Sequence, residues 1–293
     1  MSEIIPDRYQ PFREIRTNDR FSTFEGLLED KKVFIKFAAD PKLKDRIPLE
    51  ARGLAAMQQL DPDESYYHVP GVIELGDNYI VTEWANGASM ANDFEAMDMD
   101  RVDHDLDYLR HLYSFIDHTP MADVNMEDVI NKSVDKSLGN LQALVYEKHV
   151  DEALVLKTAE YLRVNGKVIE PRATNGDLQP GNIMIADGYM PTIIDCESYR
   201  DTWPRHYNIV NLAFNYGARY PVLRDKLNNM LSSYREGIGI SSKSDVVDFN
   251  VSAAMRSLQI IEERLTDHDF NPEVKDYAES AMRSILAGQL FNS

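Results

Sequence analysis

The sequence predicts an α+β protein in two parts, a strand-rich N-terminal part and a mostly helical C-terminal part. Short runs of β-branched and aromatic residues, which are typical of strands, occur at 33–37 and 79–84. Apolar residues at helical spacing dominate the end of the chain, at 246–265 and 272–290. The tripeptide at 85–87 is the expected joint. A chain of 293 residues is long enough for both parts to bury their own core.

The strand at 33–37 carries one lysine, Lys36, among apolar residues. Taken alone, a lysine in a strand is most often an exposed edge charge. Here we expect a helix to follow, beginning at Pro48 and ending before Pro62. Glu50 lies in its first turn, where a carboxylate also suits the helix dipole. Glu50 can therefore reach back to Lys36 and aim its ammonium group at phosphate oxygens; Glu64, which follows the break at Pro62, is a weaker candidate.

The most informative segment is NGDLQPGN at 175–182, which precedes two short apolar runs. It supplies a carboxylate at Asp177 and a neutral oxygen ligand at Asn182, and the second apolar run ends in Asp195. Phosphoryl transfer needs one group to orient a hydroxyl and two others to hold the magnesium ion that neutralises the phosphates. The alternative interpretation is a surface turn in which Asn and Asp only cap strand ends.

The two apolar runs are expected to form a hairpin. Residues 182–185 and 192–195 are predicted to be short buried strands, and the Asp-Gly pair at 187–188 is typical of a turn. Pairing across a four-residue loop would place Asn182 directly opposite Asp195, with Cβ atoms about 4.5–5.5 Å apart. Both side chains could then reach one hard, oxygen-seeking cation.

Together these features resemble the aminoglycoside phosphotransferase and choline kinase-like family, which are small-molecule kinases with a protein-kinase-like fold. The resemblance extends over about residues 12–213. It rests on Lys36, Glu50, EWANG at 83–87, NGDLQPGN at 175–182 and IDCE at 194–197.

The resemblance implies a bilobal protein-kinase-like fold. Residues 1–86 would form a small N-terminal lobe built on an antiparallel sheet, which binds the nucleotide, with a hinge at about 83–87. Residues 87–293 would form a larger, mostly helical C-terminal lobe, which carries the catalytic loop, the metal site and the acceptor pocket. Helices centred on 131–145 and 152–162 would shape that pocket.

The resemblance also assigns the catalytic and metal-binding roles. Asp177 would be the base that accepts or orients the proton of the substrate hydroxyl. Asn182 and Asp195 would be the ligands of Mg²⁺.

The nucleotide contacts follow from the same resemblance. Lys36 would contact the phosphates, with Glu50 holding it in place. The carbonyl of Glu83 and the amide of Ala85 would bind the adenine edge, and Thr82 would line the back of that pocket.

Three positions depart from the family pattern. Asn175 stands where histidine is usual, and because that position mostly braces the loop, we expect activity to survive. Asn211 stands where an aspartate is common, so an amide replaces a supporting carboxylate. The turn at 17–22, expected to cover the phosphates, has no glycine; its backbone amides could still face the phosphates.

Composition limits the partners and the compartment. The formal net charge of −18 argues against nucleic acid or an anionic membrane as a partner. Cys196 is the one cysteine, and neither a secretory signal nor a membrane-spanning apolar run is evident, so we expect a cytoplasmic protein. A lone buried thiol beside Asp195 is expected to be a packing residue.

Acidic residues are concentrated between residues 88 and 128, which contain eleven Asp or Glu and two Arg. Two interpretations stay open. The stretch follows the hinge, near the acceptor site of the family, so it could attract a cationic acceptor such as an amino sugar or a quaternary amine. Alternatively, it is a solvated acidic helix face that aids solubility.

The sequence therefore predicts a small-molecule kinase. It would move the γ-phosphoryl group of ATP or GTP to a hydroxyl of a small polar acceptor, for example an aminoglycoside, an amino sugar or a choline-like alcohol. The alternative is a catalytically weak or inactive nucleotide sensor or scaffold. A protein kinase is disfavoured, because the fifteen residues between Asp195 and Asn211 are too few for an activation segment and a peptide-docking platform. The acceptor, the preferred nucleotide and the oligomeric state are left open.

Overall fold

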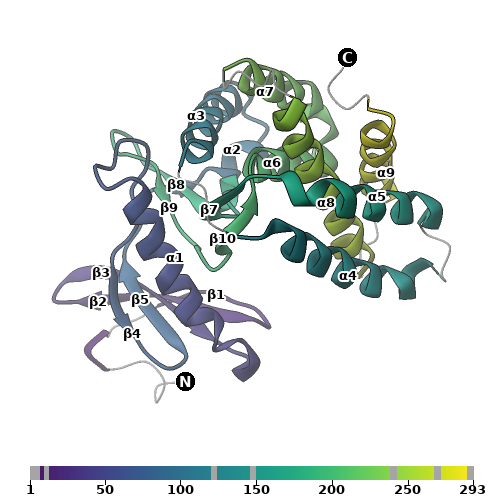
Figure 1. Cartoon of the computed structure of the whole chain (residues 1–293). Helices are drawn as coiled ribbons and strands as arrows, with labels where there is room; N and C mark the ends of the chain where they lie inside the picture. Colours follow the sequence, from purple (N-terminus) through teal and green to yellow (C-terminus); the bar gives the residue numbers. More distant parts are fainter. Residues whose placement is uncertain are drawn as a thin grey trace. The chain divides into compact units, whose positions relative to one another are not determined.

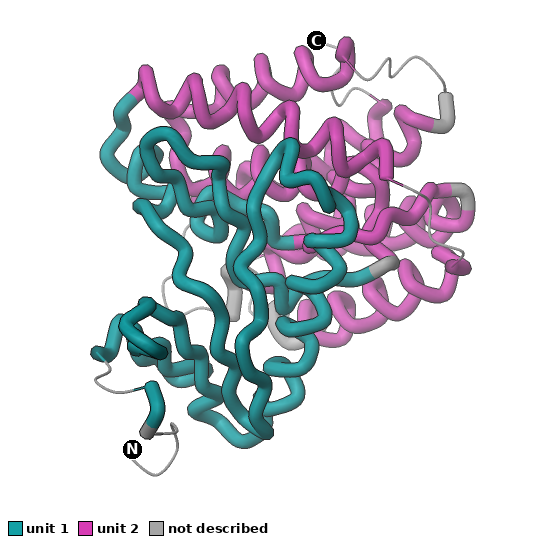
Figure 2. The backbone as a smooth tube through the Cα atoms, turned by 90° about the vertical axis from the view of Figure 1, so that its left-hand side faces the viewer, with its two compact units in different colours: residues 1–98, 177–200 teal, residues 99–176, 201–293 magenta. Residues whose placement is uncertain are grey.

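Figure 1 shows the helices and strands of the chain in a computed structural model. The chain forms two compact units, which Figure 2 shows in different colours. Unit 1 comprises residues 1–98 and 177–200, and unit 2 comprises residues 99–176 and 201–293. The lobe boundary at the hinge stays a prediction, because this division is drawn from contacts and assigns 177–200 to unit 1. The structure describes residues 7–9, 13–119, 124–145, 150–237, 243–266 and 272–288.

The described residues of unit 1 form two sheets and two α-helices. Its elements in chain order are β1 (Arg13–Thr17), β2 (Phe21–Leu28), β3 (Lys31–Ala38), α1 (Arg46–Leu60), β4 (Val72–Leu75), β5 (Tyr79–Glu83), β6 (Ala88–Ser89), α2 (Ala91–Glu95), β8 (Ile183–Ile185) and β9 (Thr192–Ile193).

The larger sheet has five strands in the order β1-β2-β3-β5-β4, and the neighbouring strands are antiparallel. Val33 and Ile35 of β3 are buried in one apolar cluster with Tyr9, Phe24 and Val81. Successive side chains of a strand point to opposite faces. The residue after Ile35 is Lys36, so its side chain leaves the other face of β3. Helix α1 packs against β3, β4 and β5.

Strand β4 begins only at Val72, although the apolar run in the sequence starts at Val69. Pro70 has no N–H group to give to a sheet. The next residue, Gly71, is bound by Glu83 in two ways: its carbonyl accepts from the Glu83 N–H at 3.0 Å, and its N–H donates to Glu83 Oε2 at 2.9 Å. These two hydrogen bonds join the start of β4 to the end of β5.

The smaller sheet of unit 1 has the order β6-β8-β9. Its β8–β9 hairpin confirms the two predicted short strands, but the predicted register is wrong by one residue. Ile183 pairs with Ile193, and the N–H of Ile194 donates to the carbonyl of Asn182 at 2.9 Å. Asn182 therefore lies opposite Ile194, and Asp195 follows one residue beyond the pair.

The turn explains the shift in register. The N–H of Tyr189 donates to the carbonyl of Ala186 at 3.1 Å, and Gly188 adopts a left-handed φ of 76°. Ala186 is thus part of the turn and does not pair with Pro191. The sequence predicted the turn residues correctly but not the length of the loop.

Unit 2 is mostly helical. Its elements are α3 (Met99–Asp117), α4 (Met126–Val145), α5 (Glu152–Asn165), β7 (Pro171–Asn175), most of β10 (Tyr199–Pro204), α6 (Tyr207–Arg219), α7 (Arg224–Gly237), α8 (Lys243–Thr266) and α9 (Pro272–Leu286). Strands β7 and β10 form a two-stranded sheet.

The helices predicted in this unit are present. Those centred on 131–145 and 152–162 are α4 and α5, and the segments at 246–265 and 272–290 are α8 and α9. Residues 267–271, between these two segments, and the last residues of the final segment lie outside the described residues. Helix α8 packs against α6 and α9, as expected for helices that bury one apolar face. Among the described helices, none is both long enough and apolar enough to cross a membrane.

Candidate active site

Lys36 lies near the middle of β3, a central strand of the larger sheet. Its side chain is only 7% exposed, and its Nζ lies 2.6 Å from Glu50 Oε2 and 2.9 Å from Asp195 Oδ1. The pairing with Glu50 was predicted; the contact with Asp195 was not. A buried lysine needs such partners, because an unpaired ammonium group would be costly to remove from water.

Helix α1 delivers Glu50 to this lysine. The helix begins at Arg46, so Glu50 lies in its second turn, not the first as predicted, and is buried. Gly53, about one turn further on, lies against the segment after β9: a Cβ atom there would meet the carbonyl oxygen of Cys196 at 2.1 Å. Glycine in a helix costs stability, but here it permits the close approach of helix and loop.

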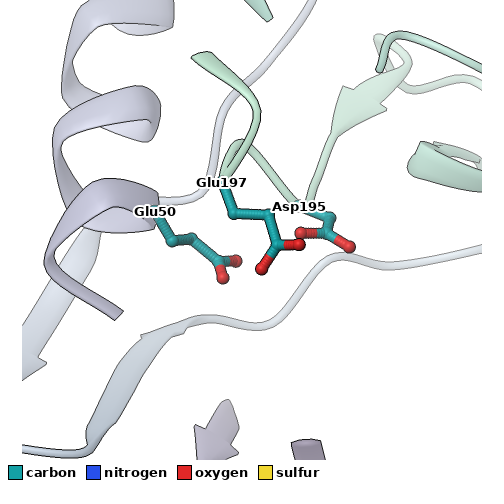
Figure 3. A group of neighbouring side chains, drawn as sticks. All are labelled: Glu50, Asp195 and Glu197. Atoms are coloured by element: carbon teal, nitrogen blue, oxygen red, sulfur yellow. The ribbon is translucent and has the colours of Figure 1, made fainter. Parts of the chain in front are cut away.

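The segment that follows β9 contributes two carboxylates. Asp195 adopts a left-handed φ of 56°, which breaks the alternation of the strand and sets its side chain toward Lys36. Glu197 lies beside it, with Oε2 3.6 Å from Lys36 Nζ. Figure 3 shows the carboxyl groups of Glu50, Asp195 and Glu197 gathered together, and one oxygen from each lies within 4.8 Å of the others.

Sequence reasoning gave no role to Glu197. The available signal was its place two residues after Asp195 in IDCE. Cys196, between them, is fully buried, and burial raises the pKa of its thiol well above the usual value. A thiol held protonated in this way packs and does not react, in line with the expectation for this residue.

The charges of the cluster do not balance. Burial alone would lower the pKa of Lys36, but the three surrounding carboxylates outweigh burial and hold that pKa above its usual value. Burial raises the pKa of Glu50, and the negative charges of Asp195 and Glu197 reinforce the effect against the opposing charge of Lys36. One buried cation therefore faces three carboxylates.

These residues fit a divalent cation. Glu197 Oε2 is buried and forms no hydrogen bond with any described residue. Carboxylate and amide oxygens are the ligands that Mg²⁺ and Ca²⁺ prefer. A divalent ion would offset the excess negative charge around Lys36.

Asp177 and Asn182 are directly linked in the loop before β8. The side-chain N–H₂ of Asn182 donates to the carbonyl of Asp177 at 2.8 Å and to its Oδ2 at 3.1 Å, and Gln179 Nε2 donates to Asp177 Oδ1. The amide nitrogen of Asn182 thus faces Asp177, which leaves the amide oxygen as its ligand atom for a cation. Through its own carbonyl, Asn182 is bound to Ile194, next to Asp195.

In unit 2, the residues just before Asp177 are held tightly. A Cβ atom on Gly176 would lie 2.0 Å from Cε2 of the Trp203 ring, so close packing, not a left-handed φ, requires glycine here. Asn211 is buried, and its Nδ2 donates to the Gly176 carbonyl at 3.2 Å. An aspartate, the common residue at this position of the family, could not make that hydrogen bond when ionised. Asn175 is fully buried beside them.

The proposed hinge residues lie at and beyond the end of β5. Thr82 is buried, and its hydroxyl donates to the carbonyl of Glu83 at 3.1 Å. Ala85 is half-buried in the extended segment that follows. Gly87 has a φ of 100°, and a Cβ atom there would lie 1.9 Å from the carbonyl of Ile185. At residue 87 the chain therefore crosses so close to β8 that only glycine fits.

No protein-family model matches the chain, and a comparison with curated proteins finds no match. Solved structures do match. The aminoglycoside phosphotransferase APH(4)-Ia is 13% identical over 98% of this chain and 95% of that chain, with a TM-score of 0.63. The chain has the aminoglycoside phosphotransferase fold.

Two further structures share this fold. The aminoglycoside phosphotransferase APH(2")-IIa, solved with streptomycin and ATP, is 11% identical over 97% of this chain and 95% of that chain, with a TM-score of 0.58. An ethanolamine kinase of Plasmodium vivax is 11% identical over 97% of this chain and 84% of that chain, with a TM-score of 0.57. The protein-kinase-like fold class predicted from the sequence is thereby confirmed.

Proposed function

We propose that the protein is a small-molecule kinase, which transfers the γ-phosphoryl group of a nucleoside triphosphate to a hydroxyl of a small polar acceptor. The observation that carries the proposal is the position of Lys36, whose Nζ contacts both Glu50 and Asp195 within 2.9 Å. Phosphoryl transfer depends on positioning and on neutralising charge. A buried lysine oriented by a helix carboxylate, next to a carboxylate suited to metal, supplies both.

Asp177 is the proposed base. Hydrogen bonds from Gln179 and Asn182 fix the orientation of its carboxylate. As a carboxylate, Asp177 would accept the proton of the acceptor hydroxyl as the oxygen attacks the γ-phosphorus. A positioned general base contributes about 10²–10⁴-fold to the rate.

Asn182 and Asp195 are the proposed ligands of Mg²⁺, and Glu197 lies beside Asp195. When bound, the ion would supply positive charge to the phosphate oxygens. Lys36, kept protonated by its three carboxylate neighbours, would hold those oxygens from the side of β3. Glu50 would keep the ammonium group in place.

The nucleotide base is proposed to bind at the end of β5, through the carbonyl of Glu83 and the amide of Ala85, with Thr82 behind it. ATP and GTP are both candidate donors. Solved structures of this fold hold ADP and AMP-PNP, in APH(4)-Ia, and ATP, in APH(2")-IIa.

The proposed acceptor is a small alcohol that carries positive charge, such as an amino sugar, an aminoglycoside or a choline-like compound. Structures with this fold were solved with hygromycin B, streptomycin and gentamicin. The acidic stretch at 88–128 supports a cationic acceptor, because Glu95, Asp98, Asp100 and Asp103 are exposed. The same exposure suits a solvated acidic face, so the acceptor assay must decide between them.

The test is phosphoryl transfer from ATP or GTP, with Mg²⁺, to a panel of amino sugars, aminoglycosides, choline-like amines and hydroxy amino acids. The Asp177→Asn variant should bind nucleotide like the wild type but lose at least 100-fold in kcat, because the amide cannot accept the proton. Asp187→Asn, in the exposed turn of the β8–β9 hairpin, is the matched control. Unchanged turnover in Asp177→Asn would remove Asp177 from the mechanism. Magnesium-dependent nucleotide binding without transfer to any acceptor would favour the nucleotide sensor.

A further inference from the structure

The tip of the β1–β2 hairpin has no glycine, and the N–H groups of Asn18, Arg20 and Phe21 are already engaged. The side-chain oxygen of Asn18 accepts hydrogen bonds from the N–H groups of Arg20 and Phe21, both at 2.8 Å. The N–H of Asn18 donates to the carbonyl of Phe21 at 3.0 Å. The expectation that backbone amides of this turn could face phosphates is therefore wrong for Arg20 and Phe21, whose donors are used within the hairpin.

The same tip presents a guanidinium group. The side chain of Arg20 is 56% exposed, and its Nη2 lies 2.8 Å from Glu197 Oε1. Among the described residues, Glu197 is the one hydrogen-bond partner of this guanidinium, which has five N–H donors. The backbone beneath it is fixed at both ends, because the carbonyl of Arg20 also accepts from the N–H of Ala39 at 3.1 Å.

Arg20 shares its surroundings with Lys36. The two oxygens of Glu197 face the two cations: Oε1 binds Arg20, and Oε2 lies 3.6 Å from Lys36 Nζ. The ring of Phe21 lies beside both, with its centroid 5.3 Å from Arg20 Cζ and 4.5 Å from Lys36 Nζ. A phosphate group bound by Lys36 would therefore be close to the unused donors of Arg20.

We propose that Arg20 binds the phosphates of the nucleotide, in the role that free backbone amides have in a glycine-rich loop. Arginine suits this role, because its planar donors match phosphate oxygens in pairs. An ion pair formed by an arginine that is more than half exposed contributes little to stability, so exchanging Glu197 for phosphate oxygens costs little. The inference rests on the proposed function and names one more nucleotide ligand for it.

The test compares nucleotides with and without phosphates. Affinities of wild type, Arg20→Ala and Arg20→Lys for ATP with Mg²⁺ and for adenosine are measured by calorimetry. Arg20→Ala should lose about 10- to 100-fold in ATP affinity and keep its adenosine affinity, because only the charged hydrogen bonds are removed. Arg20→Lys should recover part of the loss, since lysine keeps the charge but not the paired donors.

The matched control is Arg13→Ala, at the other end of the same hairpin. Arg13 is also exposed and pairs with a glutamate, with its Nη2 2.6 Å from Glu25 Oε2. The Arg13→Ala variant should bind ATP and adenosine with the same affinities as the wild type. ATP binding by Arg20→Ala equal to the wild type, or an equal loss for ATP and adenosine, would overturn the assignment while the proposed function stands. A wild type that binds neither nucleotide nor adenosine would overturn the proposed function and the assignment with it.

Discussion

At the residue scale, the site has an excess of negative charge, because three carboxylates surround one buried lysine. Glu50, Asp195 and Glu197 come from a helix and from the segment after β9, and their oxygens lie within 4.8 Å of one another. Like charges at this distance repel, and burial makes the repulsion stronger. Lys36, together with Arg20 through its ion pair with Glu197, offsets part of this repulsion in the absence of ligand, and a divalent cation would offset the rest. The cluster therefore depends on Lys36, the one buried cation among these three carboxylates.

Lys36→Met should therefore weaken the fold in a way that depends on pH. At pH 7.5 the free energy of unfolding should fall by about 3–5 kcal/mol, the usual cost of breaking a buried ion pair. Without the lysine, the folded-state pKa of Glu50 rises further above its unfolded value, so stability is lost as the pH rises through the folded pKa. The loss should be smaller at pH 5.5, and smaller when MgCl₂ is added. Urea denaturation at both pH values, with and without Mg²⁺, measures this.

Lys32→Met is the control for this variant. Lys32 lies on the same strand, and its Nζ is 2.8 Å from Glu25 Oε1, but its side chain is 53% exposed. Its replacement should change stability by less than about 1 kcal/mol at either pH. If the two variants behave alike, the cluster around Lys36 does not have the charge imbalance described above.

Asn211 shows how a departure from the family pattern can have a physical reason. Its amide donates to the carbonyl of Gly176 and accepts from Asn215 Nδ2 at 3.0 Å, so both ends of the side chain are used. Asparagine can donate and accept at once, whereas an ionised aspartate can only accept. The amide therefore secures the residue before Asp177 in a way that a carboxylate could not.

Asn211→Asp should lower the free energy of unfolding by about 2–4 kcal/mol, because it removes a buried donor and buries a charge. Asn228→Asp, at an exposed position of α7, should change it by less than about 0.5 kcal/mol. Thermal denaturation of both variants at pH 7.5 checks this. If Asn211→Asp melts at the same temperature as Asn228→Asp, the hydrogen bond from Asn211 to Gly176 does not stabilise the loop before Asp177.

At the scale of elements, the site depends on how closely α1 approaches the segment after β9. Gly53 makes this approach possible, since a Cβ atom there would meet three atoms of Cys196 and Tyr199 within 2.9 Å. The same helix carries Glu50 to Lys36. A small residue in the helix therefore sets the position of a carboxylate about one turn away.

Gly53→Ala should separate the helix from that segment, although alanine is the better helix former. We expect a loss of about 1–3 kcal/mol of stability, as for overpacking a core, together with weaker nucleotide binding because Glu50 moves away from Lys36. Gly139→Ala, in α4, is the matched control: no atom lies within 4 Å of its added Cβ. That variant should gain about 0.5–1 kcal/mol, the difference in helix propensity. A gain of stability in both variants would contradict the close approach of α1.

At the scale of the whole molecule, short sequence patterns predicted individual elements and motif residues. Periodicity located α8 and α9, and the motif at 175–182 located Asp177 and Asn182, whereas α6 and α7 were not predicted. Lys36 and Asp195, which form an ion pair, are 159 residues apart, and Arg20 and Glu197 are 177 residues apart. The sequence did not predict these ion pairs between residues that are far apart in the chain. The register error at β8–β9 is local, because one extra residue in the turn shifts every pair of the hairpin.

Among the described residues of unit 2, we expect Asp248 of α8 to contribute most to the pH dependence of the free energy of unfolding. This carboxyl group is buried, and burial raises its pKa to about 7; the charges of Glu170 and Asp245 reinforce the shift, while a backbone hydrogen bond and Arg205 oppose it. Because the folded pKa lies above the unfolded value, the folded state binds the proton more tightly. The stabilisation is complete below about pH 4. It is lost as the pH rises through about 7.

Asp248→Asn keeps the shape of the side chain and removes this titration. Relative to the wild type, its free energy of unfolding should rise progressively between pH 4 and pH 7, by about 1–4 kcal/mol at the upper end, and stay level above it. Asp276→Asn, whose side chain is 70% exposed on α9, should follow the wild-type curve at every pH. Urea denaturation in steps of one pH unit measures both. A difference between Asp248→Asn and the wild type that is constant with pH would show that Asp248 is already ionised in the folded protein, stabilised by Arg205.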